Sequence, residues 1–336
     1  MKHILFMATG GTIASEQTGD GLMPRLDAQS LLSSVPQIRA CCRVFAISPM
    51  QLDSTNMRPC DWLRLAACIE REYDNYDGFV IAHGTDTMAY TAGALSYLVQ
   101  HSAKPIVITG AQKPISLQDT DARINLAQAF TYAVDRRAHG VVIVFDGKVI
   151  MGTRARKTRT KSRNAFDSVD YPAIALLTDR GIVRYLSEDV PSEALQCYCA
   201  LDDKVAVIKL VPGMDASVLD YLRERNSALV IESFGVGGLP NAGGGALIEG
   251  ILRWKAENKP VVITTQVPHE GSDMSLYEVG LRIKSQYDVM EAYNMTLEAV
   301  VTKLMWILGQ TKQMNEVREL FYTPVAHDLL VAEAHT

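Results

Sequence analysis

The sequence has few cysteines and histidines for its length, six and seven in 336 residues, and shows no cluster of them with carboxylates. The cysteines lack the paired C-x-x-C spacing of a zinc site, and they stand at Cys41, Cys42, Cys60, Cys68, Cys197 and Cys199. This pattern predicts no metal and no cofactor. Unpaired thiols are typical of a reducing compartment, so the sequence favours a cytoplasmic location.

An excess of positive charge is also missing, because 33 Lys and Arg stand against 38 Asp and Glu, which gives a net charge of −5. Nucleic-acid-binding domains usually carry a basic excess, so a nucleic-acid partner is not expected. No apolar run reaches membrane-spanning length, and the run after residues 1–3 is too short for a signal peptide. The apolar fraction of 48% fits a globular protein large enough for two domains.

Apolar runs alternate with helical patterns along the first half of the chain. Strands are expected at 4–6, 44–47, 79–81, 106–108 and 141–145, and helices at 62–72 and 86–99. Such alternation predicts an α/β fold with a mostly parallel sheet and helices on both faces. The pattern weakens from about residue 186 to 203 and then resumes. We therefore predict a larger N-terminal α/β domain at 1–190, a linker at 191–204 and a smaller C-terminal α/β domain at 205–336.

A hydroxyl and two glycines follow the first predicted strand. The segment 7–15 reads Met-Ala-Thr-Gly-Gly-Thr-Ile-Ala-Ser, so Thr12 stands on a sharp turn at the carboxyl end of a strand. Open α/β sheets bind ligands at that edge, and Thr12 is a candidate nucleophile there. Taken alone, a tight turn with an incidental threonine explains the segment better.

A second threonine motif follows the strand at 79–81. Residues 82–88 read Ala-His-Gly-Thr-Asp-Thr-Met and lead into a helical pattern. Thr85 or Asp86 is expected to cap that helix. Capping does not explain two threonine clusters at strand ends of one sheet. His83 is expected to be a packed, hydrogen-bonded histidine rather than a base.

The two motifs together resemble those of the bacterial-type L-asparaginase family, in particular its cytoplasmic type I and archaeal-like members. Further segments match in order along nearly the whole chain, namely 53–57, 108–114, 156–158, 164–168, 211–214, 235–240 and 264–266. The resemblance implies hydrolysis of L-asparagine, a small-molecule substrate, to L-aspartate and ammonia, in a homodimer or homotetramer.

Amide hydrolysis needs a nucleophile, a base and donors for the oxyanion. The residues alone do not decide which threonine attacks. The resemblance implies that Thr12 forms the acyl-enzyme, while Thr85, Lys157 and Asp86 relay protons. Lys157 lies in the densest basic run of the chain, 154–163, whose other cations are interpreted as electrostatic surroundings in a solvated loop.

The resemblance also implies substrate contacts from Asp53, Ser54, Thr55, Thr85 and Asp86. A buried carboxylate at Asp86 would pair with the α-ammonium group of the substrate. The alternative for 53–55 is an ordinary Asx or Ser/Thr turn before the helix expected near Cys60, and this turn is favoured when the segment is taken alone.

One departure concerns the lid after the first motif. Members of the family carry a tyrosine there, and Leu22 stands at its place, so either another group, such as Tyr277 or a water, supplies the missing hydroxyl, or activation of the nucleophile is weaker. Two other activities remain as alternatives. The first is a glutaminase-asparaginase, because one methylene in a pocket is worth only about 1–3 kcal/mol. The second is a subunit of a tRNA-dependent amidotransferase, which shares the fold but has an extra N-terminal domain, whereas the first strand is expected here near residue 3.

Overall fold

A computed structural model describes residues 1–19, 21–187, 189–240, 245–276 and 278–330. The chain divides into two compact units, the N-terminal unit Met1–Cys199 and the C-terminal unit Ala200–Thr336. The division falls inside the predicted linker 191–204. The limits of the predicted domains stay a prediction.

The N-terminal unit is built on an eight-stranded sheet with the order β13-β12-β9-β8-β7-β5-β1-β4. Its strands are β1 (His3–Ala8), β4 (Arg43–Ile47), β5 (Gly78–Ala82), β7 (Pro105–Thr109), β8 (Gly140–Phe145), β9 (Lys148–Met151), β12 (Ala175–Thr178) and β13 (Gly181–Arg184). From β4 to β8 the neighbours run parallel, and from β8 to β13 they run antiparallel. The expected mostly parallel sheet is thus confirmed.

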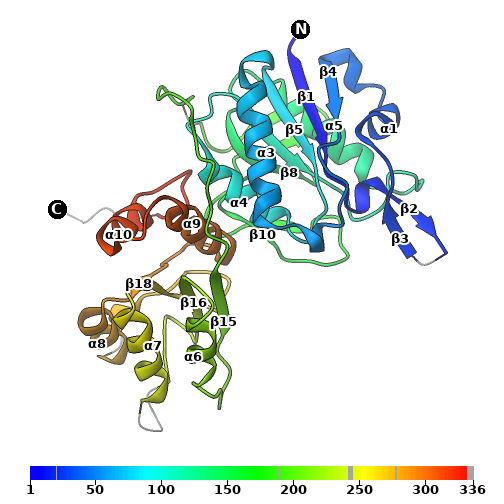
Figure 1. Cartoon of the computed structure of the whole chain (residues 1–336). Coiled ribbons are helices and arrows are strands. Elements are labelled where there is room, and N and C mark those ends of the chain that lie inside the picture. The colour runs from blue at the N-terminus through cyan, green and yellow to red at the C-terminus, as the bar shows by residue number, and fades with distance from the viewer. Residues whose placement is uncertain (20, 188, 241–244, 277, 331–336) are drawn as a thin grey trace. The chain divides into compact units, whose positions relative to one another are not determined.

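The central strands are apolar throughout because helices cover both faces of the sheet. Residues of β1 alternate between the two faces, and Ile4 and Phe6 pack in one core with Leu31 of α1 and Phe130 of α5. The helices of the N-terminal unit are α1 (Ala28–Ser33), α2 (Ile38–Cys41), α3 (Pro59–Glu72), α4 (Met88–Leu98) and α5 (Ala122–Ala133). In Figure 1, α3 and α4 lie on the near face of the sheet and α5 lies behind it.

The connections change direction between the neighbouring strands β1 and β5. After β1 the chain passes to α1 and α2, which belong to the same face as α5. After β5 it passes to α4, which contacts α3 on the opposite face. Adjacent parallel strands whose connections leave toward opposite faces form a topological switch point, and ligands of open α/β sheets bind there. Both threonine motifs leave the sheet at this point.

Smaller strand pairs complete the N-terminal unit. They are the hairpin β2 (Ser15–Thr18) and β3 (Gly21–Pro24), the pair β10 (Ala155–Lys157) and β11 (Phe166–Ser168), and the pair β6 (Val99–Gln100) and β14 (Gln196–Cys197). Single turns of 3₁₀ helix stand at η1 (Thr12–Ala14), η2 (Ser54–Asn56) and η3 (Tyr73–Asn75). The first two of these turns hold predicted site residues.

The C-terminal unit has a four-stranded parallel sheet of order β15-β16-β17-β18. Its elements are β15 (Val205–Lys209), α6 (Val218–Arg223), β16 (Ala228–Ser233), α7 (Ala246–Ala256), β17 (Val261–Thr265), η4 (Met274–Leu276), α8 (Glu278–Tyr287), β18 (Met290–Glu291), α9 (Leu297–Gln310) and α10 (Met314–Tyr322). Ile231 and Ile263 of the sheet pack with Ile251 and Trp254 of α7 in one core. The predicted smaller α/β unit is confirmed.

Candidate active site

Three loops meet at the carboxyl edge of the parallel strands. The loop after β1 and the loop after β4 are joined by two backbone hydrogen bonds, from Leu52 N to Thr9 O at 2.8 Å and from Gly11 N to Leu52 O at 2.8 Å. The loop after β5 joins them through Ser54, whose carbonyl accepts a hydrogen bond from Thr87 Oγ1 at 2.8 Å. Segments far apart in the sequence are thereby held as one framework.

Glycines allow the two threonine motifs to touch. Gly11 has a φ of 76°, and a Cβ on it would stand 2.2 Å from the Cα of Gly84. A Cβ on Gly84 would in turn stand 2.5 Å from Ser54 Oγ. Real Cβ atoms do not approach so closely, so both positions require glycine. Since Thr12 and Thr85 directly follow these glycines, the contact brings the two threonine turns together.

Thr85, Asp86 and Lys157 form one hydrogen-bonded cluster. Lys157 Nζ lies 2.8 Å from Thr85 Oγ1 and 2.6 Å from Asp86 Oδ1. Thr85 is 5% exposed, the Lys157 side chain 17% and the Asp86 side chain 57%. A lysine held between a buried hydroxyl and a carboxylate can take or return a proton at that hydroxyl.

The strand β10 ends at Lys157, and Asp167 of β11 fixes the segment that follows. Asp167 accepts hydrogen bonds from Lys148 Nζ at 2.7 Å, Thr158 Oγ1 at 2.6 Å and Arg159 Nη1 at 2.6 Å. Burial raises the pKa of Asp167, but these donors outweigh burial and hold the pKa well below its usual range. The carboxylate therefore stays charged and anchors the chain next to Lys157.

Thr12 stands at the first position of η1, half-buried, on the turn made by Gly10 and Gly11. Both glycines have positive φ, 104° and 76°, a conformation that L side chains rarely adopt. Within the part of the chain that the structure describes, the Thr12 hydroxyl has no hydrogen-bond partner. It is therefore free to approach a ligand at the switch point.

The segment Asp53–Thr55 is both a turn and part of the loop framework. Asp53 Oδ1 accepts a hydrogen bond from Thr55 N at 3.0 Å, which is the Asx turn that the residues alone favour. Asp53 and Thr55 are exposed, whereas Ser54 is 3% exposed and its Oγ accepts from Asp86 N at 3.3 Å. Ser54 thus orients the backbone of Asp86.

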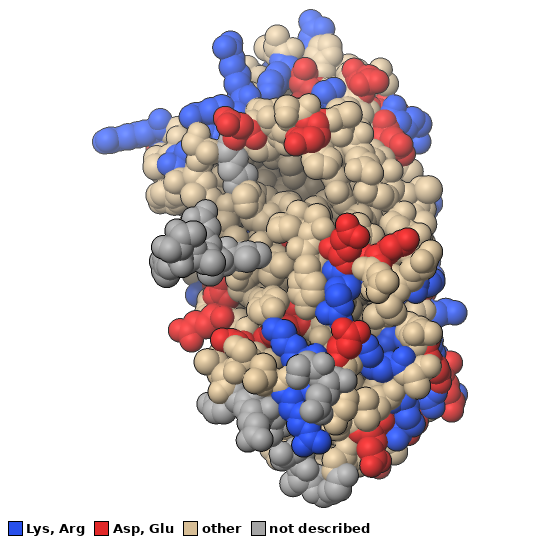
Figure 2. All heavy atoms as spheres, turned by 90° about the vertical axis from the view of Figure 1, so that its left-hand side faces the viewer, with Lys and Arg blue, Asp and Glu red and all other residues tan. Residues whose placement is uncertain are grey.

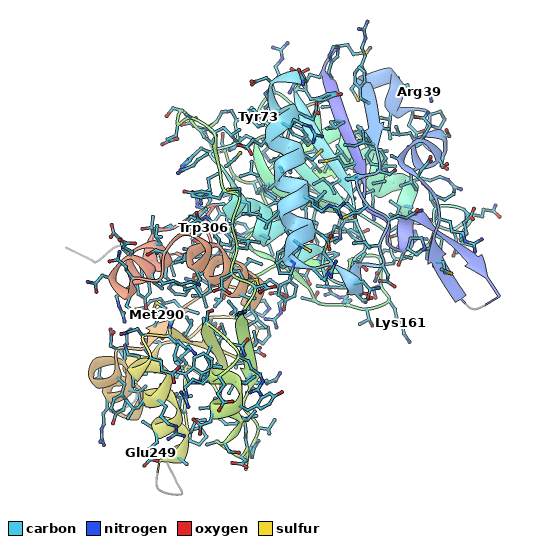
Figure 3. The ribbon with its side chains drawn as sticks, viewed as in Figure 1. Arg39, Tyr73, Lys161, Glu249, Met290 and Trp306 are labelled. Atoms are coloured by element: carbon cyan, nitrogen blue, oxygen red, sulfur yellow. The ribbon has the colours of Figure 1, made fainter. Side chains whose placement is uncertain are left out.

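Three sequence-based expectations are wrong in detail. The helix α4 begins at Met88 with Thr87 as its N-cap, without a side-chain cap, because Thr85 and Asp86 turn toward Lys157 instead. Asp86 is exposed rather than buried. The basic run is not wholly solvated, because Arg154 is fully buried. Figure 3 shows Lys161, of the same run, at the end of the N-terminal unit opposite Tyr73.

His83 is the packed histidine that the sequence indicates. It is fully buried, with Nδ1 2.6 Å from Gly84 O and Nε2 2.9 Å from Thr91 Oγ1. Burial lowers the pKa of His83 to about 4, so the ring is neutral near pH 7. Its two bonds connect the Thr85 turn to α4.

Sequence reasoning missed the contribution of Gln112, which contacts the cluster from the loop after β7. Thr85 Oγ1 donates to Gln112 Oε1 at 3.3 Å. Asp121, 4% exposed, accepts from the backbone of Gln112 at 2.9 Å and of Lys113 at 3.0 Å. The signal available was the position of Gln112, three residues after the end of a central parallel strand.

The predicted lid corresponds to the hairpin of β2 and β3, where Gln17 pairs with Leu22. The side chain of Leu22 lies outside the described part of the chain, and so does Tyr277.

Among the described residues, no group of three or more His, Cys, Asp or Glu side chains is arranged to hold a metal ion. The described helices are all too short or too polar to cross a membrane. On the face drawn in Figure 2, basic and acidic side chains are intermixed rather than gathered by sign.

The fold and the site define a two-unit α/β protein with a hydroxyl–lysine–carboxylate cluster at the switch point of its larger sheet. Residues 3–190 match the family model "Asparaginase, N-terminal", and residues 204–321 match "Glutaminase/Asparaginase C-terminal domain". The chain belongs to the asparaginase family, which confirms the resemblance seen in its motifs.

Relatives support this assignment over nearly the full chain. An L-asparaginase from Thermococcus kodakarensis is 37% identical over 97% of this chain and 98% of its own length. A subunit of the glutamyl-tRNA(Gln) amidotransferase of Pyrococcus abyssi is 31% identical over 98% of this chain but 77% of its own length. A solved structure of the thermostable L-asparaginase from T. kodakarensis matches with a TM-score of 0.92, at 35% identity, over 98% of this chain and 100% of that one.

Proposed function

We propose that this protein is an L-asparaginase that hydrolyses the side-chain amide of L-asparagine to L-aspartate and ammonia. The observation that carries the proposal is the contact of Lys157 Nζ with both Thr85 Oγ1 and Asp86 Oδ1, at 2.8 and 2.6 Å. This cluster stands beside the Thr12 turn at a ligand-binding edge of the sheet. Family membership and the similarity to an L-asparaginase over 98% of its length support the same activity.

Thr12 is the proposed nucleophile. Its hydroxyl oxygen adds to the amide carbon, the C–N bond breaks, and ammonia leaves with the proton that the hydroxyl gives up. The resulting ester is hydrolysed by water to aspartate and free Thr12. Thr85 and Lys157 move the protons in both steps, and Asp86 balances the charge of the lysine.

The substrate is bound by the loops after β4 and β5. Asp53, Thr55 and Asp86 expose polar groups that fit an ammonium and a carboxylate, and the turn that holds them is fixed by the buried Ser54. Thr85 completes the set next to the amide. In this arrangement Ser54 acts mainly through the backbone of Asp86.

The cellular context belongs to the proposal as well. The six cysteines are all free thiols, two of them buried, as suits a reducing cytoplasm. A homodimer or homotetramer is proposed from the family resemblance. Sedimentation of the purified protein would measure the oligomeric state directly.

Ammonia release from L-asparagine by wild type, Thr12→Ala and Thr85→Ala tests the proposal. Wild type should release ammonia, and both variants should lose at least about a hundredfold in kcat while remaining folded by circular dichroism. L-Glutamine serves as the competing substrate, since one methylene separates the two. No release by wild type would refute the activity, and full activity in both variants would refute the site.

A second candidate follows from the amidotransferase relative of P. abyssi, which is similar over 98% of this chain. If this chain acted as part of such an amidotransferase, ammonia release would depend on a partner protein and tRNA. Activity of the purified chain alone at the same rate with and without a cell extract of its source would exclude that role.

A further inference from the structure

Gln112 and Lys157 both contact the hydroxyl group of Thr85. Gln112 lies in the loop after β7, half-buried, and its Oε1 accepts the Thr85 hydroxyl proton at 3.3 Å. Lys157 Nζ approaches the same hydroxyl oxygen as a donor, at 2.8 Å. The Thr85 hydroxyl therefore has one partner for its proton and another for a lone pair.

The orientation of the Gln112 side-chain amide is fixed by the hydrogen bond that its nitrogen donates. Gln112 Nε2 donates to Ser162 O at 3.1 Å. A flipped amide would set Oε1 against that carbonyl oxygen, where neither atom can donate. The oxygen of Gln112 must consequently face Thr85, and the amide offers it an acceptor and not a donor.

The backbone below this amide is also held. Asp121 is 4% exposed and accepts from Gln112 N at 2.9 Å, Lys113 N at 3.0 Å and Asn125 Nδ2 at 3.3 Å. A carboxylate with several donors keeps one geometry, because each charged hydrogen bond is strong. Gln112 is therefore set in place before any substrate arrives.

These contacts determine the hydrogen-bond inventory of Thr85. A threonine hydroxyl has one proton and two lone pairs. With the proton directed to Gln112 and one lone pair directed to Lys157, only the second lone pair is left for a ligand. While Lys157 is charged, Thr85 cannot pass its proton to the lysine, and the relay is closed.

We propose that Gln112 is a positioning residue for this site, which directs the Thr85 O–H away from Lys157 and thereby favours the charged lysine. The inference rests on the proposed amide hydrolysis. The relay opens when Lys157 loses its proton and the Thr85 O–H turns from Gln112 to Lys157 Nζ. Gln112 and the neutral lysine compete for one proton, so Gln112 sets the pH at which the relay begins to work.

The other charges around Lys157 stay the same when Gln112 is exchanged. Asp86 is the carboxylate in direct contact, and on β11 Asp167 is occupied by Lys148 and Arg159. The helix α4, which contacts β10, contains no charged residue. The exposed cations of the loop are Arg159, Lys161 and Arg163. A change in the titration of Lys157 can thus be attributed to residue 112.

Two variants of similar size test the proposal in opposite directions. Gln112→Met removes the acceptor, so the Thr85 proton turns to neutral Lys157, and the acid-side midpoint of the kcat profile should move down by about one pH unit. Gln112→Glu gives up the bond to Ser162 O but offers Thr85 a charged acceptor, which favours the charged lysine, and the midpoint should move up by a similar amount. In both variants KM should change less than kcat.

The matched control is Gln29→Met on α1, the same exchange at an exposed position, which should leave the profile unchanged. NMR of the protein with ¹³Cε-labelled lysine measures the titration midpoint of Lys157 without any substrate. The Lys157 signal is assigned by its loss in Lys157→Arg. Opposite shifts of the two variants support the proposal, even if wild type releases no ammonia. The absence of ammonia release would refute only the proposed function. Shifts in one direction, or lower activity with an unchanged midpoint, would overturn the role proposed for Gln112.

Discussion

The two threonine turns of the N-terminal unit differ in how they are held. Thr85 is 5% exposed, and its hydroxyl has a partner on each side, Lys157 and Gln112. Thr12 is half-buried, and its hydroxyl bonds to no residue that the structure describes. Its backbone is fixed by the bond of Gly11 N to Leu52 O at 2.8 Å and by Ser15 Oγ, which donates to Gly11 O at 3.0 Å.

This contrast suits two different tasks. A proton relay needs donors and acceptors in a set order, because each transfer depends on distance and direction. A nucleophile needs a hydroxyl that can reach the substrate carbon without first breaking strong bonds. The turn whose threonine hydroxyl is held by side chains is the one proposed for proton transfer, and the turn whose threonine hydroxyl bonds to no described residue is the one proposed for attack.

Replacement of Lys157, whose ammonium group contacts the Thr85 hydroxyl, should have the largest effect on activity. Lys157→Met should lower kcat on L-asparagine about a thousandfold, since a positioned acid–base group contributes about 10²–10⁴. Lys157→Arg should not rescue it, because a guanidinium does not give up its proton. Steady-state ammonia release measures both. A rate within tenfold of wild type would show that Thr85 works without the lysine.

A substitution that forces the two threonine turns apart should have the second largest effect, on the stability of the fold. Gly11→Ala places a Cβ 2.2 Å from Gly84 Cα, at a φ of 76°. We expect a loss of more than about 3 kcal/mol in the free energy of unfolding. Gly140→Ala is the matched control, because Gly140 has a φ of 66° but nothing within 4 Å of its Cβ position. It should lose only about 1–2 kcal/mol of backbone strain. Equal losses, by urea unfolding, would contradict the close approach.

The Thr85 turn alone carries a buried histidine, which should make stability depend on pH. The pKa of His83 is lowered from 6.5 to about 4, so the unfolded chain binds a proton that the folded one refuses. Stability should therefore fall by up to about 3 kcal/mol as the pH drops from 6.5 to 4, and level off above 6.5. His83→Gln should remove this slope in urea unfolding curves. The half-buried His139→Gln should keep it, and an unchanged slope in His83→Gln would contradict the assignment.

The smallest effect concerns the hairpin that follows the Thr12 turn. By resemblance to the family, Leu22→Tyr restores a lid hydroxyl and should raise kcat severalfold. Met23→Tyr is the control, since adjacent residues of a strand point to opposite faces. A rate for Leu22→Tyr that is unchanged or lower would show that the Thr12 turn does not use such a hydroxyl.

Much of the N-terminal fold could be predicted because its signals are local. The apolar run at Ile4 marks a strand buried on both faces, and Gly11 marks a sharp turn at its end. The helix expected from residue 62 starts slightly earlier, at Pro59, which a helix accepts at its first position. The N-cap of α4 was mispredicted because tertiary contacts of Thr85 and Asp86 replaced local capping.

The sequence by itself determined the parallel strands of the N-terminal sheet, the glycine turns and the family to which their motifs belong, since each of these depends on residues close together in the chain. Only the tertiary structure decided which side chains meet. Lys157 reaches Thr85 across 72 residues because β10 packs against α4, and Gln112 reaches it because β7 lies beside β5. Strand order and helix packing fix these pairs, and no local pattern encodes either of them.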